Sequence, residues 1–121
     1  MGATPSKLVG GIFGAVYVLV GLVGFVVNPI VVFQVNTLHN VVHILVGALL
    51  LAGYFGGELR ARQINLTVGA VYLVLGILGF FVGPLQSLLA LNTADHFLHL
   101  ATAVVLLGVG LSARSRTSVT G

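Results

Sequence analysis

All four histidines of the chain lie in two short, related segments. The first is Asn-Thr-Leu-His-Asn-Val-Val-His at residues 36–43, and the second is Asn-Thr-Ala-Asp-His-Phe-Leu-His at residues 92–99. In a helix, positions spaced 0, 3, 4 and 7 residues apart share one face, so each segment predicts a polar stripe. Imidazole and carboxylate groups at this spacing can bind transition metals, ligate porphyrins or hydrogen-bond one another. We therefore expect the specific chemistry of the chain in these two segments.

The first interpretation of the polar stripes is structural. Their side chains would hydrogen-bond across the two halves of the protein, each bond contributing about 0.5–1.5 kcal/mol in a membrane. Asn36 and Asn92 are expected to cap the helices that follow them, because an Asn side chain accepts from free first-turn amides. The same cluster would include the other polar residues at similar depth, namely Asn40, Tyr17 and Tyr72.

The second interpretation is a cofactor. His43 and His99 are equivalent residues of the two segments, and two symmetry-related histidines can ligate a haem or another porphyrin-like pigment from opposite sides. The chain contains no cysteine, so covalent haem attachment through Cys-x-x-Cys-His is excluded.

The third interpretation is a metal ion or a transported proton. His39 and His43 lie one helical turn apart, and nitrogen and oxygen ligands of this kind suit zinc or copper(II). The same residues would serve a small proton or metal-ion transporter. The candidate ligands are His39, His43, Asp95, His96 and His99.

The overall composition indicates a membrane protein. Of 121 residues, 58% are hydrophobic and 6% are charged, and the mean hydropathy is +1.17. These values lie outside the usual range of soluble globular proteins. Five Lys and Arg residues form no basic patch for nucleic acid. The sequence also contains no catalytic triad, phosphate loop or pair of catalytic carboxylates. We expect one membrane domain, residues 1–121, without enzymatic activity.

Four apolar segments are each long enough to cross a hydrocarbon core about 30 Å thick as a helix. They comprise residues 8–27, 36–56, 64–83 and 92–112. Every basic residue falls on one side of these spans, and the positive-inside rule then predicts that both termini are cytoplasmic. The basic residues are Lys7, Arg60, Arg62, Arg114 and Arg116, and Glu58 is expected in the same loop as the first two arginines.

The two halves of the chain repeat one another. The glycines and the tyrosine of the first span recur 55 residues later, and the polar segments recur 56 residues later. We expect an all-α four-helix bundle of two tandem helical hairpins, residues 8–56 and 64–112, with the same orientation in the membrane. Small residues on one helix face let a neighbouring helix approach closely. The expected packing residues are Gly14, Gly21, Gly24, Gly69, Gly76 and Gly79.

Three features resemble the bacterial membrane proteins catalogued as domain of unknown function 4383. They are the Asn-x-x-His start of the second span, the glycine and tyrosine pattern of the first and third spans, and the four-span layout. The resemblance covers nearly the whole chain and implies a small four-helix membrane protein without indicating an activity.

We expect a non-catalytic protein of the bacterial inner membrane. It would be a structural or accessory component that packs with itself or with a larger membrane complex. Its partners would then be the lipid bilayer and other membrane subunits or further copies of the chain.

Overall fold

The chain folds into helices throughout the part that the structure describes. The computed structural model describes residues 4–27 and 35–120, with side chains described up to residue 112. Its elements are α1 (Pro5–Val23), α2 (Thr37–Gly56), α3 (Glu58–Gly79), α4 (Gly83–Leu89) and α5 (Thr93–Thr120). Three whole helices, α1, α2 and α3, and the Thr93–Ser112 part of α5 are long and apolar enough to span a membrane. The protein is an all-helical membrane protein.

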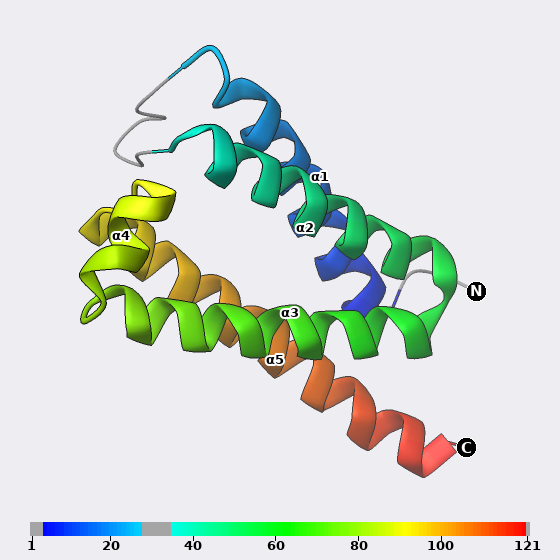
Figure 1. Ribbon diagram of the computed structural model, residues 1–121. Coiled ribbons are helices and arrows are strands. Elements are labelled where there is room, and N and C mark those ends of the chain that lie inside the picture. The colour runs from blue at the N-terminus through cyan, green and yellow to red at the C-terminus, as the bar shows by residue number, and fades with distance from the viewer. Residues whose placement is uncertain (1–3, 28–34, 121) are drawn as a thin grey trace.

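The long helices pack as two hairpins, α1 against α2 and α3 against α5 (Figure 1). Contacts between α2 and α3 join the two pairs. The short helix α4 lies at the end where α2 and α5 begin, whereas both termini and the α2–α3 turn lie at the opposite end (Figure 1). The buried core between the pairs consists of Tyr17, Leu50, Val68, Tyr72, Ala103 and Leu106.

Glycines bring the helices of each hairpin into close contact. A Cβ atom on Gly14 would lie 2.8 Å from the carbonyl oxygen of Gly47, and the reverse distance is 2.6 Å. In the second hairpin, a Cβ on Gly69 would lie 2.9 Å from Leu107 Cγ, and one on Gly76 would lie 2.7 Å from Leu100 Cδ2. The glycine stripes therefore pack against the neighbouring helix of the same hairpin. Because glycine has no side chain, the two helix backbones can approach closely there.

The remaining glycines of these stripes also face the partner helix of their own hairpin. A Cβ on Gly21 would lie 2.6 Å from Ile44 Cγ1. Gly24 meets the side chain of Asn40, and Gly79 meets that of His96 at the equivalent position.

Asparagine side chains fix the starts of α2 and α5, which confirms the expected capping. Asn36 Oδ1 accepts a hydrogen bond from His39 N at 2.8 Å. Asn92 Oδ1 accepts from Asp95 N at 3.0 Å, and Asp95 Oδ2 accepts from Asn92 N at 2.9 Å. This reciprocal pair is a capping box. Both helices that carry histidines consequently begin at equivalent positions.

The third span differs from the prediction at both ends. Hydropathy indicated residues 64–83, but α3 runs from Glu58 to Gly79. Glu58 and Arg60 therefore lie in the first turn of a helix and not in a loop. Hydropathy reports where a helix meets lipid, and Glu and Arg are good helix formers that extend α3 beyond that boundary. Gly57, at φ 98°, forms the turn from α2 by adopting a backbone conformation that favours glycine.

The first span also has shifted ends, whereas the last span lies where it was expected, within a longer helix. Hydropathy indicated residues 8–27, whereas α1 begins at Pro5, behind the N-cap Thr4, and ends at Val23. Proline at the first helical position requires no intrahelical hydrogen bond, so it starts the helix before the apolar run. The fourth span was expected at 92–112, which agrees with the Thr93–Ser112 part of α5, and the helix itself continues to Thr120.

Candidate metal centre

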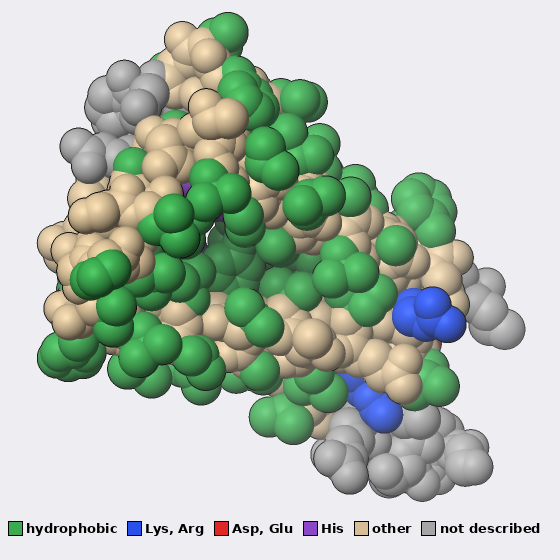
Figure 2. All heavy atoms as spheres, viewed as in Figure 1, with side chains coloured by type: hydrophobic (Ala, Val, Ile, Leu, Met, Phe, Trp, Pro, Cys, Tyr) green, Lys and Arg blue, Asp and Glu red, His purple; other side chains and the backbone are tan. Residues whose placement is uncertain are grey.

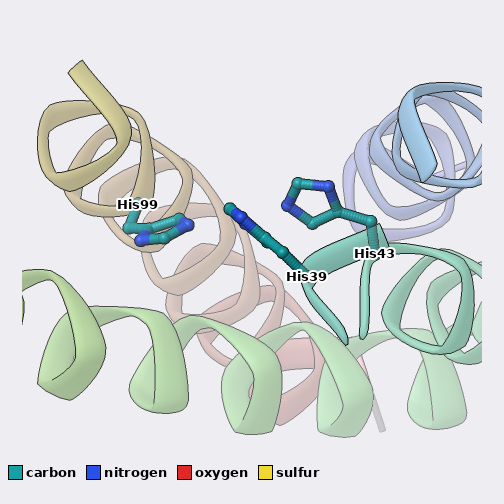
Figure 3. A group of neighbouring side chains, drawn as sticks. All are labelled: His39, His43 and His99. Carbon is teal, nitrogen blue, oxygen red and sulfur yellow. The ribbon is translucent and has the colours of Figure 1, made fainter. Parts of the chain in front are cut away.

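His39, His43 and His99 form a buried cluster between α2 and α5 (Figure 3). Their exposed fractions are 2%, 3% and 1%, and one candidate ligand nitrogen from each lies within 4.8 Å of the other two. The ring centroid of His39 lies 4.2 Å from that of His43 and 6.0 Å from that of His99. His39 extends from α2 toward His99 on α5 (Figure 3). The structure thus brings together three of the five candidate ligands.

The capped helix starts place His43 and His99 at the same depth in the bundle, with His39 one helical turn nearer the start of α2. His43 and His99 each lie six residues inside their helix, which corresponds to about 9 Å of rise. The cluster is therefore near the α4 end of the molecule. Asn36 Nδ2 donates a hydrogen bond to the carbonyl of Leu88 at 2.9 Å, so the start of α2 is tied to α4. Little histidine surface is visible from outside (Figure 2).

Several imidazole nitrogens of the cluster are buried without a hydrogen-bond partner in the described part of the chain. They are both ring nitrogens of His43 and Nδ1 of His99. A buried polar group that lacks a partner costs about 1–3 kcal/mol. A deprotonated imidazole nitrogen carries a lone pair, and a transition-metal ion is a suitable acceptor for it. The arrangement leaves ligand atoms available at the point where three histidines converge.

One tyrosine from each hairpin packs against one of these histidines. The ring centroids of Tyr17 and His43 are 5.2 Å apart, and those of Tyr72 and His99 are 5.1 Å apart. The two tyrosines stack on each other with a centroid separation of 5.6 Å. The aromatic rings therefore fix the orientation of the histidines from the core side.

The hydroxyl of Tyr17 bonds to Thr102 Oγ1 at 2.7 Å. The sequence placed Tyr17 in the polar cluster but did not identify Thr102 as its partner. The signal is in the sequence, because Thr102 lies three residues after His99 and extends the same polar face of the helix.

Charge near the cluster is close to balanced. The starts of α2 and α5 direct the positive ends of their dipoles, about +0.5 charge each, toward this end of the bundle. Asp95 is 2% exposed in the first turn of α5, where a carboxylate compensates for those dipoles. Without that carboxylate, the helix ends would disfavour a bound cation.

Asp95 and His96 lie outside the group of three converging ligands. Asp95 Oδ2 accepts from the backbone of Asn92 in the capping box. His96 packs beside Gly79, the last residue of α3, and beside Phe80, which caps that helix; the ring centroids of His96 and Phe80 are 4.8 Å apart. The missing side chain of Gly79 allows this approach, and helical periodicity alone does not reveal it.

The same geometry does not fit a haem. A porphyrin between His43 and His99 would have to displace the ring of His39, which lies 4.2 Å from His43 and 6.0 Å from His99. The stacked tyrosines occupy the adjacent space. A single ion fits between the imidazoles with far less rearrangement than a macrocycle.

A second buried polar contact lies near the other end of the bundle. Asn65 on α3 is 1% exposed, and its Nδ2 donates to the carbonyl of Ser6 on α1 at 2.8 Å. The sequence prediction did not single out this pair, although Asn65 interrupts an otherwise apolar stretch. The contact joins the two hairpins and offers no group for chemistry.

Comparison with known proteins identifies a family and no activity. A family model described as "Domain of unknown function (DUF4383)" matches residues 7–112. This match includes all four histidines and both tyrosines of the cluster. No curated protein and no solved structure shows a significant match.

Proposed function

Since the chain belongs to the family described as domain of unknown function DUF4383, we propose a function from its own geometry. In this proposal the protein is a non-catalytic membrane protein that binds one divalent transition-metal ion, either zinc or copper(II). The observation that carries this proposal is the convergence of His39, His43 and His99, all buried, with ligand nitrogens within 4.8 Å.

The ligand types narrow the choice of metal. Three imidazoles suit zinc and copper, whereas calcium and magnesium require oxygen ligands. Zinc–nitrogen bonds of about 2.0–2.1 Å imply nitrogen separations of about 3.3 Å in a tetrahedral site. Small rotations of the three imidazole rings would bring the ligand nitrogens from their present separations, within 4.8 Å, to this distance. Three protein ligands leave a fourth position for water or an exchangeable ligand.

The proposed topology is a duplicated hairpin in the bacterial inner membrane, with both termini in the cytoplasm. The matching Tyr–His separations of 5.2 and 5.1 Å support the duplication. Lys7, Arg60 and Arg62 belong to the helix ends near the termini, which supports the orientation through the positive-inside rule. The metal ion would then lie below the outer surface, beneath α4.

Cobalt(II) offers a direct optical test of the metal site. Purified protein titrated with Co²⁺ is expected to develop the intense visible bands of four-coordinate cobalt, and Zn²⁺ should remove them by competition. His43→Ala and His99→Ala should each abolish the bands. A titration that yields only the weak spectrum of hydrated cobalt would reject the proposal.

We further propose a structural or accessory role, in which the protein packs against another membrane helix. The supporting observation is an exposed stripe on α5, where a Cβ on Gly108 would meet no atom within 4 Å. The stripe consists of Ala101, Val105, Gly108 and Ser112. Three of its members, Ala101, Gly108 and Ser112, are small, and small residues on one helix face favour close helix association. Cross-linking in native membranes tests it, because Gly108→Leu should abolish a cross-linked product that Leu111→Ala preserves.

A further inference from the structure

A shallow groove of about 270 Å³ lies between α1 and α2 on the outside of the bundle. Its lining is apolar and faces outward, since Leu8, Ile12 and Phe55 are 50%, 55% and 81% exposed. The residues that line it are Leu8, Gly11, Ile12, Ala15, Leu51, Tyr54 and Phe55. In a membrane, this groove opens to the acyl chains of the surrounding lipid.

A positive charge is held at one end of the groove. Lys7 Nζ lies 5.4 Å from the ring centroid of Tyr54, a separation at which a cation and an aromatic face attract. Gly11 permits this arrangement, because a Cβ there would lie only 2.9 Å from Tyr54 Cδ2. The ring can therefore rest on α1, beneath the lysine. The groove therefore has apolar walls and an ammonium group held at one end.

The end of the molecule near this lysine is basic. The described side chains there are Lys7, Arg60 and Arg62 against Glu58, so three positive charges and one negative charge give a net charge of +2. Basic side chains gather at the end that carries the termini, and hydrophobic side chains cover much of the remaining face (Figure 2). Basic residues next to apolar grooves at a membrane surface attract anionic lipid headgroups.

We propose that this groove binds one anionic phospholipid. Its phosphate lies by Lys7, and one acyl chain runs along α1 over Gly11 and Ala15. From Lys7 to Ala15 the helix rises about 12 Å, which is most of the depth of one leaflet of a core about 30 Å thick. The length, polarity and charge of the groove therefore match one end of a phospholipid.

The second hairpin supplies a matched comparison. Arg62 and Ala70 are the counterparts of Lys7 and Ala15 at the repeat offset of 55. At the counterpart of the Gly11–Tyr54 contact, Leu66 instead packs over Gly110, where a Cβ would lie 2.7 Å from Leu66 Cδ2. A leucine on α3 replaces the glycine that admits the tyrosine ring on α1. The proposed site belongs to the first hairpin alone.

Native mass spectrometry of the intact protein tests the proposal. The protein is purified, exposed to phosphatidylglycerol and phosphatidylcholine with identical acyl chains, and scored for retained lipid. Wild-type protein should retain phosphatidylglycerol preferentially, and Lys7→Gln should reduce that preference about fivefold, as expected for loss of one interfacial charge. Lys7→Arg should preserve the preference. Ala15→Phe, which fills the exposed groove, should reduce retention of both lipids.

The matched controls are Arg62→Gln, which should lower the preference for phosphatidylglycerol less than Lys7→Gln does, and Ala70→Phe, which should behave as wild type. Ala15 and Ala70 are exposed, so their substitution leaves the helix contacts intact. Equal retention of the two lipids by wild-type protein would overturn the proposal. An equal effect of Lys7→Gln and Arg62→Gln would also overturn it, because the charge would then act without a site.

Discussion

The hydroxyl of Tyr17 on α1 lies 2.7 Å from that of Thr102 on α5 and joins the first helix of one hairpin to the last helix of the other. The Tyr17 ring also stacks on Tyr72 and contacts His43. One buried hydrogen bond therefore fixes the aromatic pair against which the histidines pack. The stability of the bundle and the geometry of the cluster depend on the same contact.

We predict that Tyr17→Phe and Thr102→Val each lower the free energy of unfolding by about 1 kcal/mol, with a coupling energy of about 0.5–1.5 kcal/mol between them. Each change removes one hydroxyl and leaves its partner buried. Unfolding of the two single variants and the double variant in mixed detergent micelles measures the coupling. Thr67→Val is the control, because its exposed hydroxyl donates within α3, to the carbonyl of Gln63. Additive effects of the first two substitutions would contradict the assignment.

Gly14→Ala is predicted to destabilise the first hairpin by about 1–3 kcal/mol. Its Cβ would lie 2.8 Å from the carbonyl oxygen of Gly47, and backbone cannot yield as a flexible side chain does. Gly108→Ala is the matched control, since a Cβ there meets nothing within 4 Å and alanine is the better helix former. Thermal unfolding of both variants decides the question. Equal melting temperatures of the Gly14→Ala and Gly108→Ala variants would show that α1 and α2 do not pack through Gly14.

The helix layout explains how much the sequence could reveal. Hydropathy located four spans because apolar runs of this length indicate transmembrane helices. The asparagine pattern located the starts of α2 and α5 because helix capping requires specific side chains. The true start of α3 at Glu58 was missed, since charged helix formers continue a helix past the lipid boundary. The sequence did not give the bounds of short α4, because seven residues carry too little periodicity.

The candidate site was predicted in part for a similar reason. Periodicity put His99, His96 and Asp95 on one face of a helix, but it does not give the rotation of that helix against its neighbours. Gly79 draws His96 toward α3, and the capping box uses the carboxylate of Asp95. His39, His43 and His99 remain as the converging set. Contacts across helices decide which members of a stripe meet.

The proposed orientation predicts which positions react from outside the cell. The sequence contains no cysteine, so single cysteines can be introduced without background. Ser87→Cys on exposed α4 should react with a membrane-impermeant maleimide in intact cells, whereas Arg60→Cys should react only after permeabilisation. Helix α4 and the start of α3, which carry the two positions, lie at opposite ends of the bundle (Figure 1). Labelling of Arg60→Cys in intact cells would reverse the proposed topology.

Metal content of the purified protein tests the central claim most directly. Elemental analysis by mass spectrometry should find one zinc or copper ion per wild-type chain and almost none in His43→Ala or His99→Ala, because each substitution removes a converging ligand. His96→Asn, which copies Asn40 at the equivalent position, should retain the ion. Wild-type protein with no more metal than its buffer, or His43→Ala with undiminished metal, would contradict the account.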